Sequence, residues 1–275
     1  MLETRTIADQ ATRLREIAYG RLALPTPAQP RIVTITSGKG GVGKSTLALN
    51  LSIAMCMRGE KVVLVDADAN LGSLDLMLGI APEVRLGHVL RGDRDIEDAM
   101  VSPLAGLRLL PGSSGDIEYP AGDHEARRSL LADLRQLEDR PGLIIIDTAA
   151  GLTPEIISFA GEADETIVVT SPEPTAVIDA YAMIKVIHTA IPDMPVSVVM
   201  NAVRVLSEAD DAVGKLAVAV NRFLGFSFSY RGAVPFDQNV ARAIARQRPV
   251  LQEFPASGAS LSLNAMAEQL FGRSL

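Results

Sequence analysis

The 275-residue sequence is poor in cysteine and in aromatic side chains. Its one cysteine, Cys56, cannot form a disulfide within the chain, and a single thiol cannot hold an iron–sulfur cluster or a four-cysteine metal centre. This excludes redox enzymes that need several cysteines in each chain. Because Cys56 stands in an apolar stretch, we predict that it is a small buried residue and not a ligand.

An excess of positive charge is also missing. The formal net charge is −7, and the sequence pI is about 5.1. A surface of this sign repels phosphate backbones on average, so we expect no direct binding of nucleic acid. The sequence has no apolar run of about 18 residues and no signal-peptide pattern near its start, which predicts a cytoplasmic protein.

The first part of the chain differs from the rest. Residues 1–24 are predicted to form a helix, because Ile7, Ala11, Leu14 and Ala18 recur at helical spacing. Residues 25–30 carry three prolines, which block helix continuation and indicate a linker. We therefore expect an N-terminal helical arm tethered to a single globular domain over residues 31–275.

From residue 31 onward, short apolar runs alternate with stretches of helical composition. Runs of this kind are typical of strands covered on both faces, and the intervening helices are typical of crossovers in a parallel sheet. The fold class predicted is α/β, a doubly wound and mostly parallel sheet flanked by helices. The predicted strands are residues 31–37, 61–68, 107–113, 143–150, 165–173, 196–203 and 230–237. Polar residues end many of them, at the edge where such sheets bind ligands: Ser37, Asp66, Asp68, Asp147, Ser171 and Asn201.

One turn carries a strong signal for phosphate binding. The sequence GKGGVGKS, residues 38–45, follows a predicted strand, precedes a predicted helix and fits the P-loop pattern. Glycines let backbone N–H groups face an anion, Lys44 can reach the β- and γ-phosphates, and the Ser45 hydroxyl can bind Mg²⁺. We predict a P-loop NTPase fold that binds ATP or ADP with Mg²⁺ through Gly38, Lys39, Gly40, Gly41, Val42, Gly43, Lys44, Ser45 and Thr46.

Two strand ends supply acidic residues for this site. Asp147 follows four apolar residues, in the manner of a Walker B aspartate beside the metal. Asp66 and Asp68 are two residues apart, so alternation places both carboxylates on one face of their strand. One could hold metal-bound water while the other orients the attacking water. Helix capping and solvation of a loop are the alternatives for such aspartates.

The string KGGVGKST, residues 39–46, resembles the deviant Walker A ATPases of the MinD/ParA group. This resemblance implies a face-to-face dimer with ATP between the subunits, in which Lys39 touches the phosphates of the partner. Within one subunit Lys39 has little evident purpose. The resemblance also implies that Asp68 positions the hydrolytic water and that Asp66 and Asp147 serve the Mg²⁺ shell, so that Lys39, Lys44 and Asp68 are the catalytic residues.

The likeness continues to about residue 250. The segment VVMNAVR resembles the strand end that carries an adenine-recognising asparagine, which here is Asn201. The segment that begins AVPFDQNV resembles the one that closes over the base, with Pro235 and Asp237 nearby. One departure is Ala149, where the group commonly has glycine after the Walker B strand; it removes no ligand.

Two segments resemble, within this group, the FlhG (FleN or YlxH) family of MinD-like regulators of flagellar number and placement. One is TSPEPTAVIDAYAMIK, residues 170–185. The other is DQATRLREIA, residues 9–18, which matches an activation motif through Asp9, Gln10, Ala11, Leu14 and Arg15. The resemblance implies an ATP-dependent dimerisation switch with slow hydrolysis whose N-terminal helix stimulates the SRP-type GTPase FlhF. It also implies a flagellar transcription regulator or C-ring protein as a further partner.

Other readings remain open. A MinD-type division-site ATPase or a ParA-type partition ATPase shares the nucleotide motifs, although the acidic pI disfavours the DNA binding of ParA proteins. A scaffold that binds ATP without hydrolysing it is a further alternative. The C-terminal segment, residues 261–275, has an apolar stripe of Leu263, Met266, Leu270 and Phe271 but only Arg273 as a cation. It suits equally a helix docked on the core and an amphipathic helix at the inner membrane surface.

Overall fold

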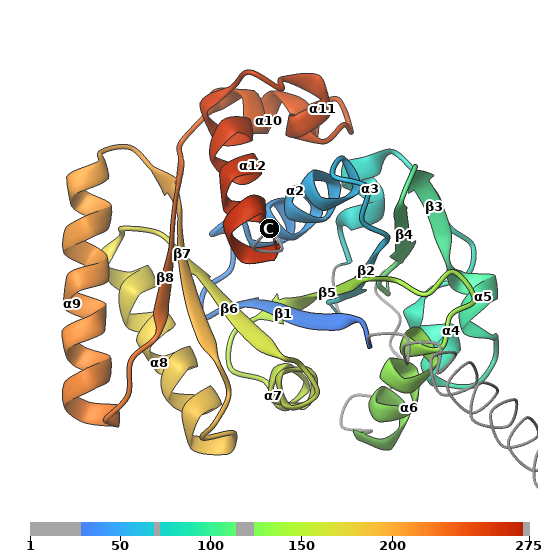
Figure 1. Cartoon of the computed structure of the whole chain (residues 1–275), viewed down its shortest axis with the longest axis horizontal. Helices are drawn as coiled ribbons and strands as arrows, with labels where there is room; N and C mark the ends of the chain where they lie inside the picture. The colour runs from blue at the N-terminus through green and yellow to red at the C-terminus, as the bar shows by residue number, and fades with distance from the viewer. Residues whose placement is uncertain (1–28, 69–71, 114–123, 272–275) are drawn as a thin grey trace, which may run out of the picture.

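The computed structural model describes residues 29–68, 72–113 and 124–271. The predicted N-terminal helix and its activation motif lie outside these residues, as does most of the predicted linker. The described chain forms one eight-stranded sheet in the order β3-β4-β2-β5-β1-β6-β7-β8, with helices on both faces (Figure 1).

The strands confirm the predicted α/β class. All neighbouring strands in the sheet run parallel except β3 and β4, which are antiparallel. Short β3 at the sheet edge was not predicted from the sequence, since it is only partly buried and contains a proline. The strands are β1 (Arg31–Ser37), β2 (Val62–Ala67), β3 (Val101–Leu104), β4 (Leu107–Leu110), β5 (Leu143–Ala150), β6 (Glu165–Thr170), β7 (Val196–Val203) and β8 (Ser229–Pro235).

The helices divide between the two faces. Alternate residues of β1 enter different cores: Val33 and Ile35 pack with α2 and α12, whereas Ile32 packs with α4 and α6 on the other face. The helices are α2 (Lys44–Cys56), α3 (Leu74–Leu78), α4 (Leu86–Leu90), α5 (Ile96–Ala99), α6 (His124–Arg135), α7 (Pro154–Gly161), α8 (Pro174–Ala190), α9 (Leu206–Leu224), α10 (Gln238–Ala245), α11 (Val250–Glu253) and α12 (Gly258–Phe271).

The thiol of Cys56 lies at the end of α2, partly buried against the core shared by α2 and α12. Burial raises the pKa of Cys56 to about 11, since the thiolate would lose hydration there. Cys56 therefore packs against apolar side chains as predicted, but it is only partly buried and not fully buried as expected.

Helix α12 packs three residues of its apolar stripe into the body of the protein. Leu263, Met266 and Leu270 are each less than 5% exposed and belong to the same core as α2. The carbonyl of Leu270 also accepts a hydrogen bond of 2.6 Å from Nη1 of Arg31 in β1. Of the two readings of the C-terminal segment, docking on the core is the one observed for this stripe. Among the described residues, no helix is long and apolar enough to cross a membrane.

Two leucines of α12 test how much this docking contributes to stability. Leu263 is 2% exposed, whereas Leu261 on the opposite side is 60% exposed. Leu263→Ala should lower the free energy of unfolding by about 3 kcal/mol, since it removes buried methyl groups and leaves a cavity. Leu261→Ala should change it by less than about 0.5 kcal/mol. Urea denaturation of both variants measures the difference, and equal effects would contradict the docking.

Candidate functional site

The glycine loop joins β1 to α2 and leaves the start of α2 open. Gly43 precedes the helix with φ +85°, and no side chain in the described chain caps the helix at this position. Gly41 also has positive φ, +80°. A Cβ at position 43 would lie 2.2 Å from Nδ2 of Asn201, so both backbone conformation and space require glycine there. The first N–H groups of a 13-residue helix are thus available to an anion.

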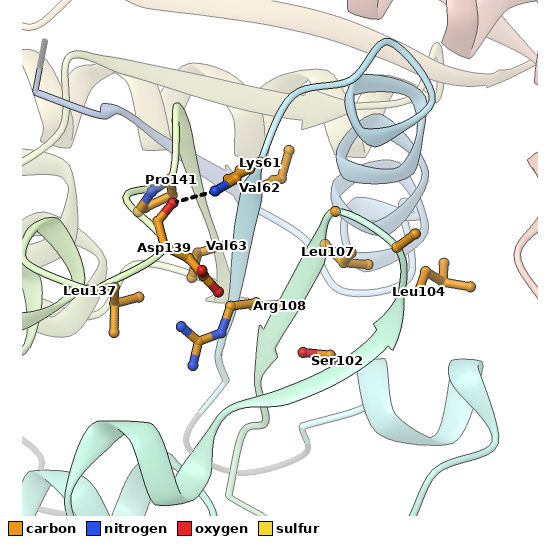
Figure 2. A pocket seen from close by; sticks show the side chains of 12 residues that line it. Lys61, Val62, Val63, Ser102, Leu104, Leu107, Arg108, Leu137, Asp139 and Pro141 are labelled. Carbon is orange, nitrogen blue, oxygen red and sulfur yellow. Dashed lines mark hydrogen bonds between the residues drawn. The ribbon is translucent and has the colours of Figure 1, made fainter. Parts of the chain in front are cut away.

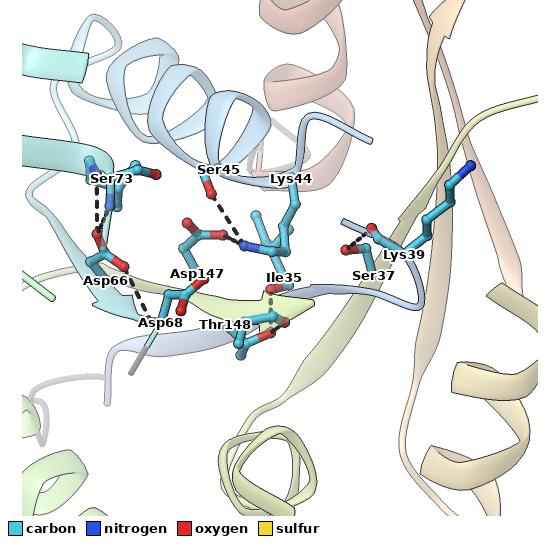
Figure 3. Close-up of polar contacts among 12 residues, drawn as sticks. Ile35, Ser37, Lys39, Lys44, Ser45, Asp66, Asp68, Ser73, Asp147 and Thr148 are labelled. Carbon is cyan, nitrogen blue, oxygen red and sulfur yellow. Dashed lines mark hydrogen bonds and ion pairs between the residues drawn. The ribbon is translucent and has the colours of Figure 1, made fainter. Parts of the chain in front are cut away.

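Lys44 is the first residue of α2, and its side chain is only 7% exposed. Its Nζ donates to Oδ1 of Asp147 at 2.7 Å and to Oγ of Ser45 at 3.2 Å (Figure 3). The P-loop lysine, the hydroxyl and the strand-end aspartate predicted from separate segments therefore meet at one point.

Asp66 lies beside Asp147, because β2 and β5 are neighbours and pair these two residues. Its Oδ2 accepts from the N–H groups of Ser73 and Leu74 at 2.9 and 3.1 Å. Burial and then the charge of Asp147 raise the pKa of Asp66 to about 7, although the N–H groups of Leu74 and Asp68 and the charge of Lys44 oppose the shift. Burial likewise raises the pKa of Asp147, against the effect of Lys44. A cation would stabilise both carboxylates.

The oxygen atoms at this point suit Mg²⁺. Oδ2 of Asp147 is buried and has no hydrogen-bond partner within the described residues, and the Ser45 hydroxyl lies close by. No cluster of three or more His, Cys, Asp or Glu that could hold a metal occurs in the described parts of the chain. These donors fit an ion that keeps waters and takes its other ligands from a bound phosphate, as Mg²⁺ does. Asp68 follows β2 near enough for its charge to act on Asp147.

A cavity of about 370 Å³ opens next to the glycine loop. Residues from β7, β8, α10 and α12 line it together with the loop, so segments far apart in the sequence come together here. Of the residues predicted to contact the nucleotide, the cavity is lined by Gly41, Val42, Gly43, Thr46, Asn201, Pro235 and Asp237. Their shared location agrees with the expectation, while their individual roles stay predictions.

Asn201 is turned toward the glycine loop by an irregularity in β7. The pairing of β7 with β8 shifts between Met200 and Val203, and Ala202 has φ +56°, which is unusual for a residue with a Cβ. Nδ2 of Asn201 then donates to the carbonyl of Val42 at 2.7 Å. Backbone strain of this kind is common at functional sites, where it holds a neighbouring side chain in a particular orientation.

The carboxylate of Asp237 connects two helices that line the cavity. Its Oδ1 accepts from the N–H of Asn239 at 2.9 Å and caps α10, and its Oδ2 accepts from the N–H of Ala259 at the start of α12 at 3.2 Å. Some loss of hydration acts to raise the pKa of Asp237, but the hydrogen bonds together lower it. Asp237, which the sequence predicts to contact the nucleotide, thus connects α10 and α12, two elements that line the cavity.

Lys39 is placed differently from Lys44. Its side chain is 40% exposed, and Nζ donates to Oε2 of Glu173 at 3.0 Å and to Oγ1 of Thr175 at 3.3 Å. Lys39 therefore has contacts within its own subunit, while its predicted contact with the phosphates of a partner subunit stays a prediction. Sequence reasoning missed the contact with Glu173, although Glu173 follows β6 at the same edge of the sheet, within a segment noted only for its family resemblance.

A separate cavity of about 260 Å³ lies at the opposite edge, beside the amino ends of β2 and β4 (Figure 2). Lys61 and Arg108 are among its lining residues, and Nζ of Lys61 donates to the carbonyl of Asp139 at 3.0 Å. It shares no lining residue with the cavity at the glycine loop. Among the described residues, those predicted for the nucleotide site are therefore gathered at only one of these two edges.

The glycine loop lies between the first strand and a helix, and its buried Lys44 forms an ion pair with Asp147 of β5. This arrangement defines a P-loop nucleotide-binding protein. The profile of the AAA domain family matches residues 30–197. The chain is 32% identical to the antiactivator FleN of Pseudomonas aeruginosa, over 87% of this chain and 86% of FleN. It is 30% identical to the flagellum site-determining protein YlxH of Helicobacter pylori, over 90% and 83%. The chain belongs to the MinD-like family of P-loop ATPases that includes FleN and YlxH.

A solved structure shows the same fold. The septum site-determining protein MinD from Pyrococcus horikoshii, complexed with Mg-ADP, superposes with a TM-score of 0.73. It is 26% identical and covers 88% of this chain and 96% of its own. The P-loop NTPase fold predicted from the sequence is thereby confirmed.

The capping role of Asp237 gives a pH-dependent stability. Because its pKa is lowered by folding, the ionised carboxylate stabilises the protein above the ordinary value of 3.8, and this contribution is lost as the pH falls through the lower folded value. Asp237→Ala should lower the free energy of unfolding by about 1 kcal/mol at pH 7, and less near pH 3. Asp237→Asn, which keeps an acceptor oxygen, should lose less. Thermal unfolding across this pH range measures both, and a pH-independent difference would refute the assignment.

Proposed function

We propose that the protein is a slow, Mg²⁺-dependent ATPase that forms a homodimer when ATP is bound and regulates flagellar number and placement. The observation that carries this proposal is the different placement of the two loop lysines. Lys44 is buried against Asp147, whereas Lys39 is exposed and turned away from it. Kinship with the antiactivator FleN and the flagellum site-determining protein YlxH supports the flagellar assignment.

Within one subunit, Lys44 connects phosphate binding to metal binding. In the structure it neutralises Asp147, which is 1% exposed. A triphosphate at the start of α2 would draw Lys44 toward its oxygens and leave the Asp147 carboxylate for a cation. Ser45, Asp66 and Asp147 would then hold Mg²⁺ directly or through water, and the ion would neutralise charge on the phosphates. Asp68 would orient the attacking water.

Lys39 is placed so that it can leave Glu173 and bind a phosphate of a second subunit. Its ion pair with Glu173 is formed between side chains that are 40% and 67% exposed. Such surface pairs contribute at most about 1 kcal/mol, because water screens both charges. A phosphate of a facing subunit, in a site from which water is excluded, would bind the ammonium more strongly. Lys39 can therefore act in trans only when a second copy approaches this edge.

The N-terminal segment completes the proposal. Residues 1–24 lie outside the described residues, so their predicted amphipathic helix and the motif at residues 9–18 rest on sequence alone. We assign to them the stimulation of an FlhF-type GTPase. A flagellar transcription regulator or a C-ring protein would bind elsewhere on the ATP-dependent dimer.

Division-site selection is the second candidate function. The likeness to the septum site-determining protein MinD, whose structure is complexed with Mg-ADP, supports it through the fold. Purification of the full chain from its own cells with ATP present separates the two candidates, since flagellar proteins would accompany it in one case and cell-division proteins in the other.

Variants of the two lysines test the dimer switch. Lys39→Ala should bind ATP with nearly unchanged affinity but lose ATP-dependent dimerisation and at least about tenfold of the hydrolysis rate, since only the contact in trans is removed. Lys44→Ala should lose ATP binding itself, and Asp68→Ala should form a long-lived dimer that does not hydrolyse ATP. Light scattering with ATP and steady-state phosphate release are the measurements. A Lys39→Ala protein that dimerises and hydrolyses normally would contradict the proposal.

The N-terminal assignment is tested with the full chain and a purified FlhF-type GTPase. The wild-type protein should accelerate GTP hydrolysis, and the double variant Gln10→Ala/Leu14→Ala should lose most of this effect because both residues belong to the activation motif. The variant Thr6→Ala, outside the motif, is the matched control. Absence of stimulation by wild-type protein with intact ATPase activity would leave only the broader MinD-like function.

A further inference from the structure

The cavity at the amino ends of β2 and β4 takes no part in the proposed nucleotide site. Its walls come from these strands, from the turn between β3 and β4, and from the segment between α6 and β5 (Figure 2). Its two cations already have partners, since Lys61 donates to the carbonyl of Asp139 at 3.0 Å and Nη2 of Arg108 donates to Oε2 of Glu97 at 2.5 Å. Most other lining residues are apolar and include Val62, Val63, Leu104, Leu107, Leu137 and Pro141. The cavity therefore suits an apolar occupant.

The cavity is open and large enough to receive side chains of another segment. Ser102 and Ala105 belong to its lining and are exposed, so the cavity faces solvent. Its volume is about 260 Å³, whereas an apolar cavity of about 150 Å³ holds a benzene molecule. It thus has room for a leucine side chain and part of a neighbouring one.

The N-terminal part of the chain joins the sheet beside this cavity. Arg31, the first residue of β1, pairs with Leu143 of β5, which pairs with the lining residue Val62 of β2. The N–H of Arg31 donates to the carbonyl of Gly142 at 3.1 Å, and the N–H of Gly142 donates to the carbonyl of Lys61 at 2.9 Å. Because neighbouring strands lie about 4.8 Å apart, the start of β1 is about 10 Å from the cavity lining.

The length of the linker is sufficient for this distance. An extended chain advances about 3.3 Å per residue, so the six residues 25–30 can span about 20 Å. They connect β1 to the predicted helix of residues 1–24, whose apolar stripe is Ile7, Ala11, Leu14 and Ala18. Amphipathic helices gain most of their stability by packing this face against another surface. The nearest such surface that the structure describes at this edge is the cavity.

We propose that the N-terminal helix docks its apolar stripe on this cavity of its own subunit, with Leu14 inserted, when no partner is bound. The inference rests on the proposed function, in which the same helix stimulates an FlhF-type GTPase. Ala11 and Leu14 belong both to the stripe and to the activation motif. A docked helix therefore cannot contact the GTPase, and the GTPase must displace it from the cavity. The contact is autoinhibitory and lies at the edge opposite the glycine loop.

Cross-linking of the full chain tests the docking directly. In a Cys56→Ser background, Arg13→Cys beside Leu14 and Ser102→Cys at the cavity should be joined within one chain by a short bis-maleimide. An excess of the GTPase should suppress this cross-link. Ala256→Cys replaces Ser102→Cys in the control, because Ala256 is exposed in the turn before α12 and lines no part of the cavity. No cross-link, equal cross-linking in the control, or a cross-link only between two chains would overturn the proposal.

Stimulation of the GTPase gives a second readout. Ala105→Glu places a charge at the rim of the cavity and should release the helix. The protein concentration for half-maximal stimulation should then fall at least about threefold, because apparent affinity depends on the fraction of undocked helix. Ala256→Glu is the matched control and should behave like wild type. An unchanged concentration for Ala105→Glu would refute autoinhibition. Wild-type protein that does not stimulate the GTPase would instead overturn the proposed function of the helix, and the cross-link would still decide the docking.

Discussion

The buried ion pair between Lys44 and Asp147 is the interaction on which the site depends. It joins the first residue of α2 to Asp147 within β5, and both side chains are nearly inaccessible to solvent. A lone buried charge at either position would cost several kcal/mol, so each partner requires the other until a ligand intervenes. The same pair offsets the repulsion between Asp147 and its neighbour Asp66. In the proposed function, a bound phosphate would replace Asp147 as the partner of Lys44, and a bound cation would replace Lys44 as the partner of Asp147.

The wall of the cavity beside the glycine loop is held by a different set of contacts. Asp237 ties the start of α10 to the start of α12, and Leu263 of α12 reaches both the core and the cavity. Since α12 packs along α2, which begins with Lys44, this cavity wall and the glycine loop rest on one hydrophobic core.

Much of this arrangement could be predicted from the sequence. Strands β1, β5 and β7 have the bounds that their apolar runs indicate, because a strand buried on both faces leaves an unbroken apolar signature. The glycine loop could be located because its chemistry needs consecutive residues of particular types. Edge strand β3 could not, since four half-exposed residues with a proline carry almost no pattern.

By itself, the sequence determined the class of protein, the phosphate loop with Lys44 and Ser45, and the acidic strand ends, since local patterns of buried strands and glycines specify them. Only the tertiary structure decided which distant residues meet. The pairing of Lys39 with Glu173, the cavity shared by Asn201 and Pro235, and the burial of α12 all depend on strand order and packing. An apolar helical stripe has the same pattern whether a membrane or a protein core covers it, and only the neighbouring surface distinguishes them.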